Sequence, residues 1–193
     1  MENGTEYRPK YTSDSMLESL QKWGIQFEHY RHIPVFTVES ANEVSHQIPG
    51  LHTRNLFLKD KKGKMYLVTL RHDTPVDLKK LSTLLGAGRF SFGSPERLWT
   101  NLGVRPGSVT PLSILNDAQK QVQLILEEAM MQGDAINFHP LLNDQTVSMA
   151  PSELLRILSL QNIDYKICDL SIVAPDAGAD MSNDPKPEKS AVC

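Results

Sequence analysis

The chain has 193 residues and a net charge of −3, with 40% hydrophobic and 22% charged residues, which is the composition of one globular domain with a real core. The net charge disfavours broad, nonspecific binding to nucleic acid but allows a local basic patch. No apolar run approaches the roughly 20 residues of a membrane helix, and the two cysteines, Cys168 and Cys193, fit neither a disulfide framework nor a metal motif. The polar N-terminus lacks the apolar segment of a signal peptide, so we expect a cytoplasmic protein without membrane contact.

Helices and strands alternate in the first half of the sequence. Ser13, Asp77 and Ser94 each precede an apolar pattern with helical spacing and can cap a helix. A turn with the sequence DKKG separates two β-rich runs, which predicts a hairpin. The predicted elements, in chain order, are a helix over 13–23, a strand over 25–31, a short helix over 39–47, hairpin strands over 54–60 and 64–70, a helix over 78–85, and a helix from 95 to about 102.

Strands dominate the second half. The stretch RPGSVTPLSILND over 105–117 predicts a loop and then a short strand at 112–115. Further strands are predicted over 121–127, 135–140, 145–150 and 164–170, with a helix beginning at Pro151 before the last of them. From about Ala174 the sequence contains almost no large apolar residues, so a disordered tail is expected.

These elements predict a mixed α/β fold with a largely antiparallel or mixed sheet, because several neighbouring strands are joined by tight turns. A doubly wound parallel sheet is disfavoured. The predicted organisation is a flexible arm over 1–12, one domain over 13–173 and a disordered tail over 174–193.

Several familiar catalytic motifs are absent from the sequence. It has no P-loop, no G-x-G-x-x-G, no H-E-x-x-H and no G-x-S-x-G. His29 and His32 would point to opposite faces of a strand, which makes them a poor metal pair. We therefore expect no metal and no cofactor. An enzyme with this sequence would rely on positioned groups and backbone donors.

Three features have two interpretations when the residues are considered alone. The segment Gly107–Pro111 can be a simple turn or a backbone cradle for a substrate, and as a loop it is expected at the surface. His139 can be a hydrogen-bonded core residue or a functional group that acts near neutral pH. The lysines around the hairpin turn can form a solvated tip or a phosphate-binding patch; they are Lys59, Lys61, Lys62 and Lys64.

Three sequence blocks together resemble the YbaK/ProX family, the free-standing relatives of the editing domain of bacterial-type prolyl-tRNA synthetases. The blocks are TRNLFLKDKKGKMYLVTL, GSVTPLSILND and INFHPLLNDQTVSM, and the resemblance covers roughly residues 13–170. It implies a mixed, barrel-like sheet flanked by helices. It also implies an aminoacyl-tRNA deacylase, most closely the branch that hydrolyses alanine wrongly esterified to proline tRNA.

The resemblance also assigns roles to individual residues. It implies that a glycine-to-proline loop embraces the aminoacyl end of the tRNA, and that His139 and Asn143 contribute to the reaction; the loop residues are Gly107, Ser108, Val109, Thr110 and Pro111. Val35, Phe36 and Phe138 would line the substrate pocket. Arg54 stands where many relatives carry lysine, and its planar fork suits a phosphate or ribose clamp better than a base. The hairpin lysines would contact tRNA phosphates.

The expected partners are the acceptor end of tRNA(Pro) and prolyl-tRNA synthetase. Two other functions stay open. One is the same chemistry on another mischarged tRNA that carries a cysteine, serine or threonine ester. The other is a non-catalytic module that binds the aminoacyl end or a synthetase surface.

Overall fold

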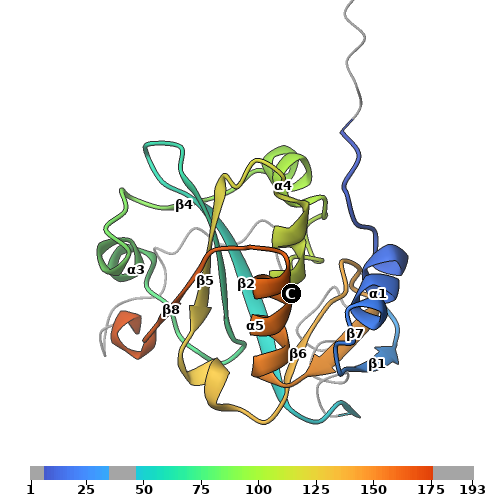
Figure 1. Cartoon of the computed structure of the whole chain (residues 1–193). Coiled ribbons are helices and arrows are strands. Elements are labelled where there is room, and N and C mark those ends of the chain that lie inside the picture. Colours follow the sequence, from blue (N-terminus) through green and yellow to red (C-terminus); the bar gives the residue numbers. More distant parts are fainter. Residues whose placement is uncertain (1–6, 35–46, 176–193) are drawn as a thin grey trace, which may run out of the picture.

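The computed structural model of the chain describes residues 7–34 and 47–175. Its strands form one twisted sheet in the order β1-β7-β6-β2-β3-β5-β8, with β4 paired to β2 outside this path (Figure 1). The strands are β1 (Glu28–Arg31), β2 (Leu51–Lys59), β3 (Met65–Arg71), β4 (Ser91–Phe92), β5 (Val122–Glu127), β6 (Ile136–Phe138), β7 (Gln145–Met149) and β8 (Tyr165–Cys168). The predicted helix over 39–47 lies almost entirely outside the described residues, and so does the predicted tail beyond residue 175.

Strand β2 is the longest strand and organises the sheet. It pairs antiparallel with β3, from Thr53 opposite Arg71 to Lys59 opposite Met65, and parallel with β6. Among the described residues, four strand pairings are antiparallel and three are parallel. The mixed sheet with flanking helices confirms the predicted fold class, and the hairpin predicted around DKKG is confirmed as β2–β3.

Local capping signals set the helix boundaries. The helices are α1 (Ser13–Lys22), α3 (Leu78–Leu84), α4 (Pro95–Leu102) and α5 (Pro151–Leu160). Asp77 and Ser94 cap α3 and α4 as predicted, whereas α1 is capped by Thr12, one residue before the predicted Ser13. Thr12 and Ser15 form a reciprocal capping box, which explains the shift of one residue. Gly103 ends α4 in the left-handed conformation.

The strand predicted at 112–115 is wrong. Residues Pro111–Asn116 form a 3₁₀ helix, η1, and all six are buried. Pro111 provides the backbone angle of a first helical residue, and Ser113 Oγ donates to the Thr110 carbonyl at 2.6 Å. Leu112 and Leu115, three residues apart, both enter the core. A short apolar run between a proline and a turn does not distinguish a strand from a tight helix.

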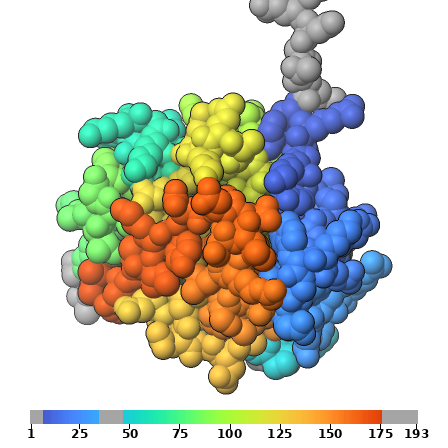
Figure 2. Space-filling model, viewed as in Figure 1, coloured from blue at the N-terminus to red at the C-terminus, as the bar shows by residue number. Residues whose placement is uncertain are grey.

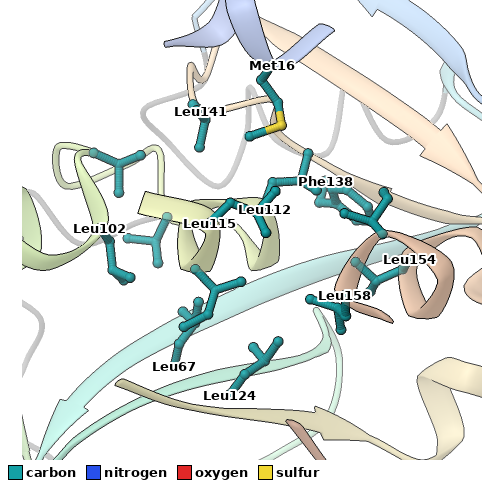
Figure 3. Packing of buried hydrophobic residues seen from close by; sticks show 14 of the residues in the cluster. Met16, Leu67, Leu102, Leu112, Leu115, Leu124, Phe138, Leu141, Leu154 and Leu158 are labelled. Atoms are coloured by element: carbon teal, nitrogen blue, oxygen red, sulfur yellow. The ribbon is translucent and has the colours of Figure 1, made fainter. Parts of the chain in front are cut away.

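Two apolar cores lie on opposite faces of the sheet. Phe57 of β2 enters the first core and Leu58 enters the second, as the two-residue period of a strand requires. The first core is packed against α1, α4, η1 and α5, and includes Met16, Leu67, Leu102, Leu112, Leu115, Leu124, Phe138, Leu141, Leu154 and Leu158 (Figure 3). The second core is packed against α3 and η3 (Ser171–Val173), and includes Leu58, Tyr66, Val68, Leu70, Leu81, Phe90, Ile125, Leu170 and Val173.

Segments from the two ends of the described chain meet on one face of the molecule. Figure 2 shows blue N-terminal residues beside the orange region that contains α5. Arg156 of α5 donates to the carbonyls of Trp23 and Gly24 at 3.2 and 2.9 Å. Residues 7–12, expected to belong to a flexible arm, also make contacts: Tyr11 N–H donates to Asn116 Oδ1 at 2.7 Å, and Asn116 Nδ2 donates back to the Tyr11 carbonyl at 3.2 Å.

Candidate functional site

The loop over 107–111 connects α4 to η1. Gly107 has a φ of 89°, which favours glycine, and the Ser108 N–H closes a turn on the Arg105 carbonyl at 3.0 Å. Contrary to the surface position expected of a loop, Gly107 and the next four residues are all buried, and Thr110 is fully inaccessible. The loop is buried because Val109 and the apolar residues of η1, which follow it directly, pack in the first core.

Three backbone donors of this loop are unpaired. The N–H groups of Gly107, Val109 and Thr110 meet no acceptor among the residues that the structure describes. Buried backbone N–H groups are nearly always hydrogen-bonded in native proteins, so such a set requires a ligand or water to satisfy it. Close-set backbone donors are the groups that stabilise an oxyanion in acyl-transfer sites.

Strand β2 anchors this loop through the half-buried amide of Asn55. Asn55 Nδ2 donates to the Val109 carbonyl at 2.9 Å, and Thr69 Oγ1 donates to Asn55 Oδ1 at 2.8 Å. Thr69 lies on β3 directly opposite Asn55 and is fully buried. The pair therefore fixes both the position of Asn55 and the amide orientation that presents its N–H₂ to the loop.

The same face of β2 also holds the segment that contains His139. Thr53 Oγ1 donates to the Asn137 carbonyl of β6 at 2.8 Å. Thr53 and Asn55 are two residues apart on one strand, so their Cα atoms are about 7 Å apart on that face. Strand β2 therefore contacts the 107–111 loop and β6, the strand that leads to His139, from neighbouring positions, although the loop and Asn137 are more than 25 residues apart in sequence.

His139 is held in one tautomer by the backbone. Its Nδ1 lies 2.8 Å from the Gln145 carbonyl, so in the neutral ring Nδ1 carries the proton and Nε2 is left as an acceptor. Desolvation by the surrounding protein lowers the pKa of His139, and the nearby His32, whose ring centroid is 6.3 Å away, also lowers it. The ring is therefore disposed to stay neutral and to accept a hydrogen bond.

The remaining residues that were predicted to form the site with His139 differ from it in burial or lie outside the described residues. Phe138 is 3% exposed and belongs to the first core, so it packs in the interior behind His139. Asn143 is half-buried in the connection between β6 and β7. Val35 and Phe36, predicted to line the pocket, lie outside the described residues.

Arg54 points away from the 107–111 loop. It lies between Thr53 and Asn55, so its side chain is on the opposite face of β2. There Nη2 donates to the Thr74 carbonyl, while Nε is buried without a partner. Burial lowers the pKa of Arg54, and the buried Glu127 carboxylate opposes this effect. The structure does not bring Arg54 together with the loop donors through any described contact.

The predicted lysine cluster occupies the exposed tip of the β2–β3 hairpin. Asp60 Oδ1 accepts the N–H groups of Lys62 and Lys64 and shapes the turn, which leaves the side chains of Lys61, Lys62 and Lys64 exposed. Lys64 also borders a cleft of about 310 Å³, which is lined by Lys120 from the turn before β5 and by Lys166 from β8. Sequence reasoning missed these two lysines because they are far from the hairpin in sequence, and only the pairing of the strands brings them near it.

Neither a metal centre nor a membrane span is found in the part of the chain that the structure describes. No group of three His, Cys, Asp or Glu side chains there is arranged to hold a metal ion. No helix there is long and apolar enough to cross a bilayer.

The family model of the aminoacyl-tRNA editing domain matches residues 32–157. This chain belongs to the aminoacyl-tRNA editing domain family. The matched range contains β2, the 107–111 loop, His139 and Asn143, so the proposed site lies inside the editing domain. The family recognised from the three sequence blocks is thereby confirmed.

Individual relatives are consistent with this membership. The chain is 36% identical over 157 residues to the prolyl-tRNA synthetase associated domain-containing protein 1 of Danio rerio, covering 80% of this chain and 85% of that protein. It is 29% identical over 157 residues to the prolyl-tRNA editing protein ProX of Acetoanaerobium sticklandii, covering 81% and 96%. A crystal structure provisionally assigned as a trans-editing enzyme for prolyl tRNA synthetase has the same fold, with a TM-score of 0.62, 20% identity, and 83% and 97% coverage.

Sequence reasoning did not identify Thr53, Asn55 and Thr69 as supports of the editing domain's site. A signal was nevertheless present, because asparagine is depleted in strands and Asn55 directly precedes the apolar run Leu56–Leu58. A polar side chain that is removed from water in a strand requires a hydrogen-bond partner. Only the fold identifies that partner as the Val109 carbonyl.

Proposed function

We propose that this editing domain is a trans-editing deacylase that hydrolyses the ester of mischarged Ala-tRNA(Pro). The observation that carries the proposal is the set of unpaired N–H groups at Gly107, Val109 and Thr110 in a buried, anchored loop. An ester hydrolase needs donors that are already oriented toward the developing oxyanion. The relationship to a prolyl-tRNA editing protein supports tRNA(Pro) as the nucleic acid.

The reaction requires little covalent chemistry from the protein. A water oxygen attacks the ester carbonyl, the carbonyl oxygen becomes negatively charged, and the loop N–H groups stabilise that charge. Collapse of the intermediate breaks the bond to the ribose oxygen, which takes up a proton as alanine is released. Neutral His139 accepts a hydrogen bond from the water or the ribose through Nε2, and Asn143 contacts the ribose or the carbonyl.

Selection of alanine over proline rests on size. A pocket lined by Val35 and Phe36 would admit the smaller side chain and exclude the proline ring by overlap, which is the logic of a second sieve. The exposed hairpin lysines Lys61, Lys62 and Lys64, together with Lys59, bind phosphates of the acceptor stem. Prolyl-tRNA synthetase is the proposed protein partner, and the cytoplasm the proposed compartment.

Arg54 supports one other candidate function, a non-catalytic module that binds the aminoacyl end. The family's lysine position is occupied here by an arginine whose head is engaged with the Thr74 carbonyl and faces Glu127. A site that uses that position for the reaction would be impaired in this chain. The loop donors, however, do not depend on Arg54.

A deacylation panel tests the proposal. Purified protein is mixed with Ala-, Pro-, Cys-, Ser- and Thr-esters of tRNA, with and without a chelator, and release of the amino acid is followed. We expect hydrolysis of Ala-tRNA(Pro), sparing of Pro-tRNA(Pro) and no effect of the chelator. Preferred hydrolysis of another ester would identify that ester as the substrate in place of Ala-tRNA(Pro). Binding of tRNA without hydrolysis of any ester would favour the non-catalytic binding module over the deacylase.

A further inference from the structure

A stack of three side chains precedes the 107–111 loop. The Arg105 guanidinium carbon lies 4.2 Å from the ring centroid of Trp99, and Tyr7 meets the Trp99 ring edge-on at a centroid distance of 6.1 Å. Trp99 is half-buried on α4, whereas Arg105 is exposed. The aromatic ring therefore holds a guanidinium group that is exposed to solvent.

No acidic side chain neutralises this arginine. Among the residues that the structure describes, Arg105 has no carboxylate partner within ion-pair distance, in contrast to Arg71 and Arg156. Arg8, which follows Tyr7, and Arg97, two residues before Trp99 on α4, are exposed cations, while Glu96 on α4 is an exposed anion and Asp117 acts electrostatically on Tyr7. Three arginines against two carboxylates leave an excess of positive charge around the stack, which favours an anionic partner such as a nucleic acid.

The stack is adjacent to the proposed reaction site. The Arg105 carbonyl accepts the Ser108 N–H at 3.0 Å, so these residues are the first and last of one turn, with Cα atoms less than about 7 Å apart. When the 3′ ester of a tRNA lies at the loop donors, its unpaired terminal nucleotides are within reach of this turn. Unpaired bases stack on aromatic rings or on guanidinium planes.

We propose that Arg105, supported by Trp99, is a stacking platform for a base in the unpaired 3′ end of the tRNA. The inference rests on the proposed function, because it takes the loop as the place of the ester. Arg105 provides a flat surface for the base and a charge for the neighbouring phosphate. Trp99 is a positioning residue that keeps the guanidinium parallel to the incoming base, and Tyr7 supports the edge of the indole ring.

Binding of uncharged tRNA tests this platform without requiring any hydrolysis. The affinity of Arg105→Ala, Arg105→Lys and the parent protein is measured for intact tRNA and for the same tRNA with its unpaired 3′ nucleotides removed. We expect Arg105→Ala to weaken binding of intact tRNA by roughly 5- to 100-fold, the range for loss of one stacked base, and to change binding of the trimmed tRNA little. Arg105→Lys should not restore affinity, because an ammonium provides no plane.

Arg97→Ala is the matched control, because it removes an exposed arginine of α4 that no aromatic ring in the described residues covers. It should lower affinity equally for intact and trimmed tRNA, if it lowers it at all. Full rescue by Arg105→Lys would overturn the platform in favour of a phosphate contact. An equal loss on both tRNAs, or no loss, would also overturn it. If Arg105→Ala lowers the melting temperature, Arg105→Gln, which keeps a long polar stem, supplies the same comparison.

Discussion

Gly107 has a backbone conformation that residues with a Cβ rarely adopt, with a φ of 89°. Gly107→Ala should destabilise the protein by about 1–2 kcal/mol, because an L-residue is strained in this region. The strain would also displace the loop donors, and loss of one oxyanion donor lowers kcat by roughly 10²- to 10³-fold. Denaturant unfolding and deacylation of Ala-tRNA(Pro) measure the two effects separately.

Gly63 provides the control for this substitution. Its φ of 86° is nearly the same, and an added Cβ there would meet no atom within 4 Å. Gly63→Ala should therefore have a similar cost in stability while leaving kcat unchanged. If both variants lose activity in proportion to their stability, the 107–111 loop is only a turn.

The protonation state of a single residue, His139, also affects the stability of the protein. Its pKa is lowered from 6.5 in the folded protein, chiefly by desolvation, so the unfolded chain binds a proton first as the pH falls. The stability contributed by the neutral ring is fully present above about pH 6.5 and decreases below that value. Stability measured by urea unfolding should therefore decrease as the pH is lowered below about 6.5.

His139→Gln should flatten this decrease, because glutamine does not take up a proton. His72→Gln, at an exposed position, is the comparison variant. A parent-like slope in His139→Gln would mean that other groups dominate the acid sensitivity.

At the scale of elements, β2 supports the two halves of the proposed site, through Thr53 toward β6 and through Asn55 toward the loop. Asn55→Ala would leave the buried Val109 carbonyl and the Thr69 hydroxyl without their partner. A buried polar group left unpaired costs about 1–3 kcal/mol. We also expect kcat to fall by at least about tenfold with little change in KM, because the loop donors lose their support while the tRNA contacts remain.

Steady-state kinetics and thermal unfolding of Asn55→Ala measure these effects. Asn101→Ala is the reference: this half-buried asparagine on α4 donates to the Arg97 carbonyl of its own helix. It should change kcat negligibly. A rise in KM with an unchanged kcat for Asn55→Ala would contradict a positioning role and indicate a direct contact with tRNA.

For the whole molecule, the last described segment closes the second core. Val173 is 1% exposed, its carbonyl accepts the Asp77 N–H at 2.7 Å, and the Ala174 carbonyl accepts from Lys80 Nζ at 2.9 Å. A chain truncated after Pro175 should therefore keep the parent's melting temperature and turnover. Truncation before Ser171 removes a buried valine and the carbonyl that meets the start of α3, and should lower stability by about 2 kcal/mol or more.

Thermal unfolding of the two truncated chains decides this prediction. Equal melting temperatures for both would show that η3 adds nothing to the second core. A large decrease for the longer chain would mean that residues beyond 175 contribute to the folded state.

Local interactions are readable in the sequence, and they determined much of this fold. Asp77, Ser94 and Gly103 act on backbone groups within a few residues of themselves, so they mark helix ends without any tertiary context. The β2–β3 hairpin is equally local, because a four-residue turn joins two strands of matched pattern. The three motif blocks likewise identified the editing family, and they pointed to Gly107–Pro111 and His139 before any geometry was known.

Contacts between residues distant in sequence decided the rest. Pro111–Asn116 is a 3₁₀ helix because Leu112 and Leu115 find the first core three residues apart, which no local propensity specifies. The loop is buried and anchored because Asn55, 54 residues away, meets the Val109 carbonyl. Arg54 donates to the Thr74 carbonyl on the other face because successive strand residues face opposite sides of the sheet. The sequence indicated which residues are candidates for the chemistry, because motifs are local; the packing of the sheet determined which of these residues share a face.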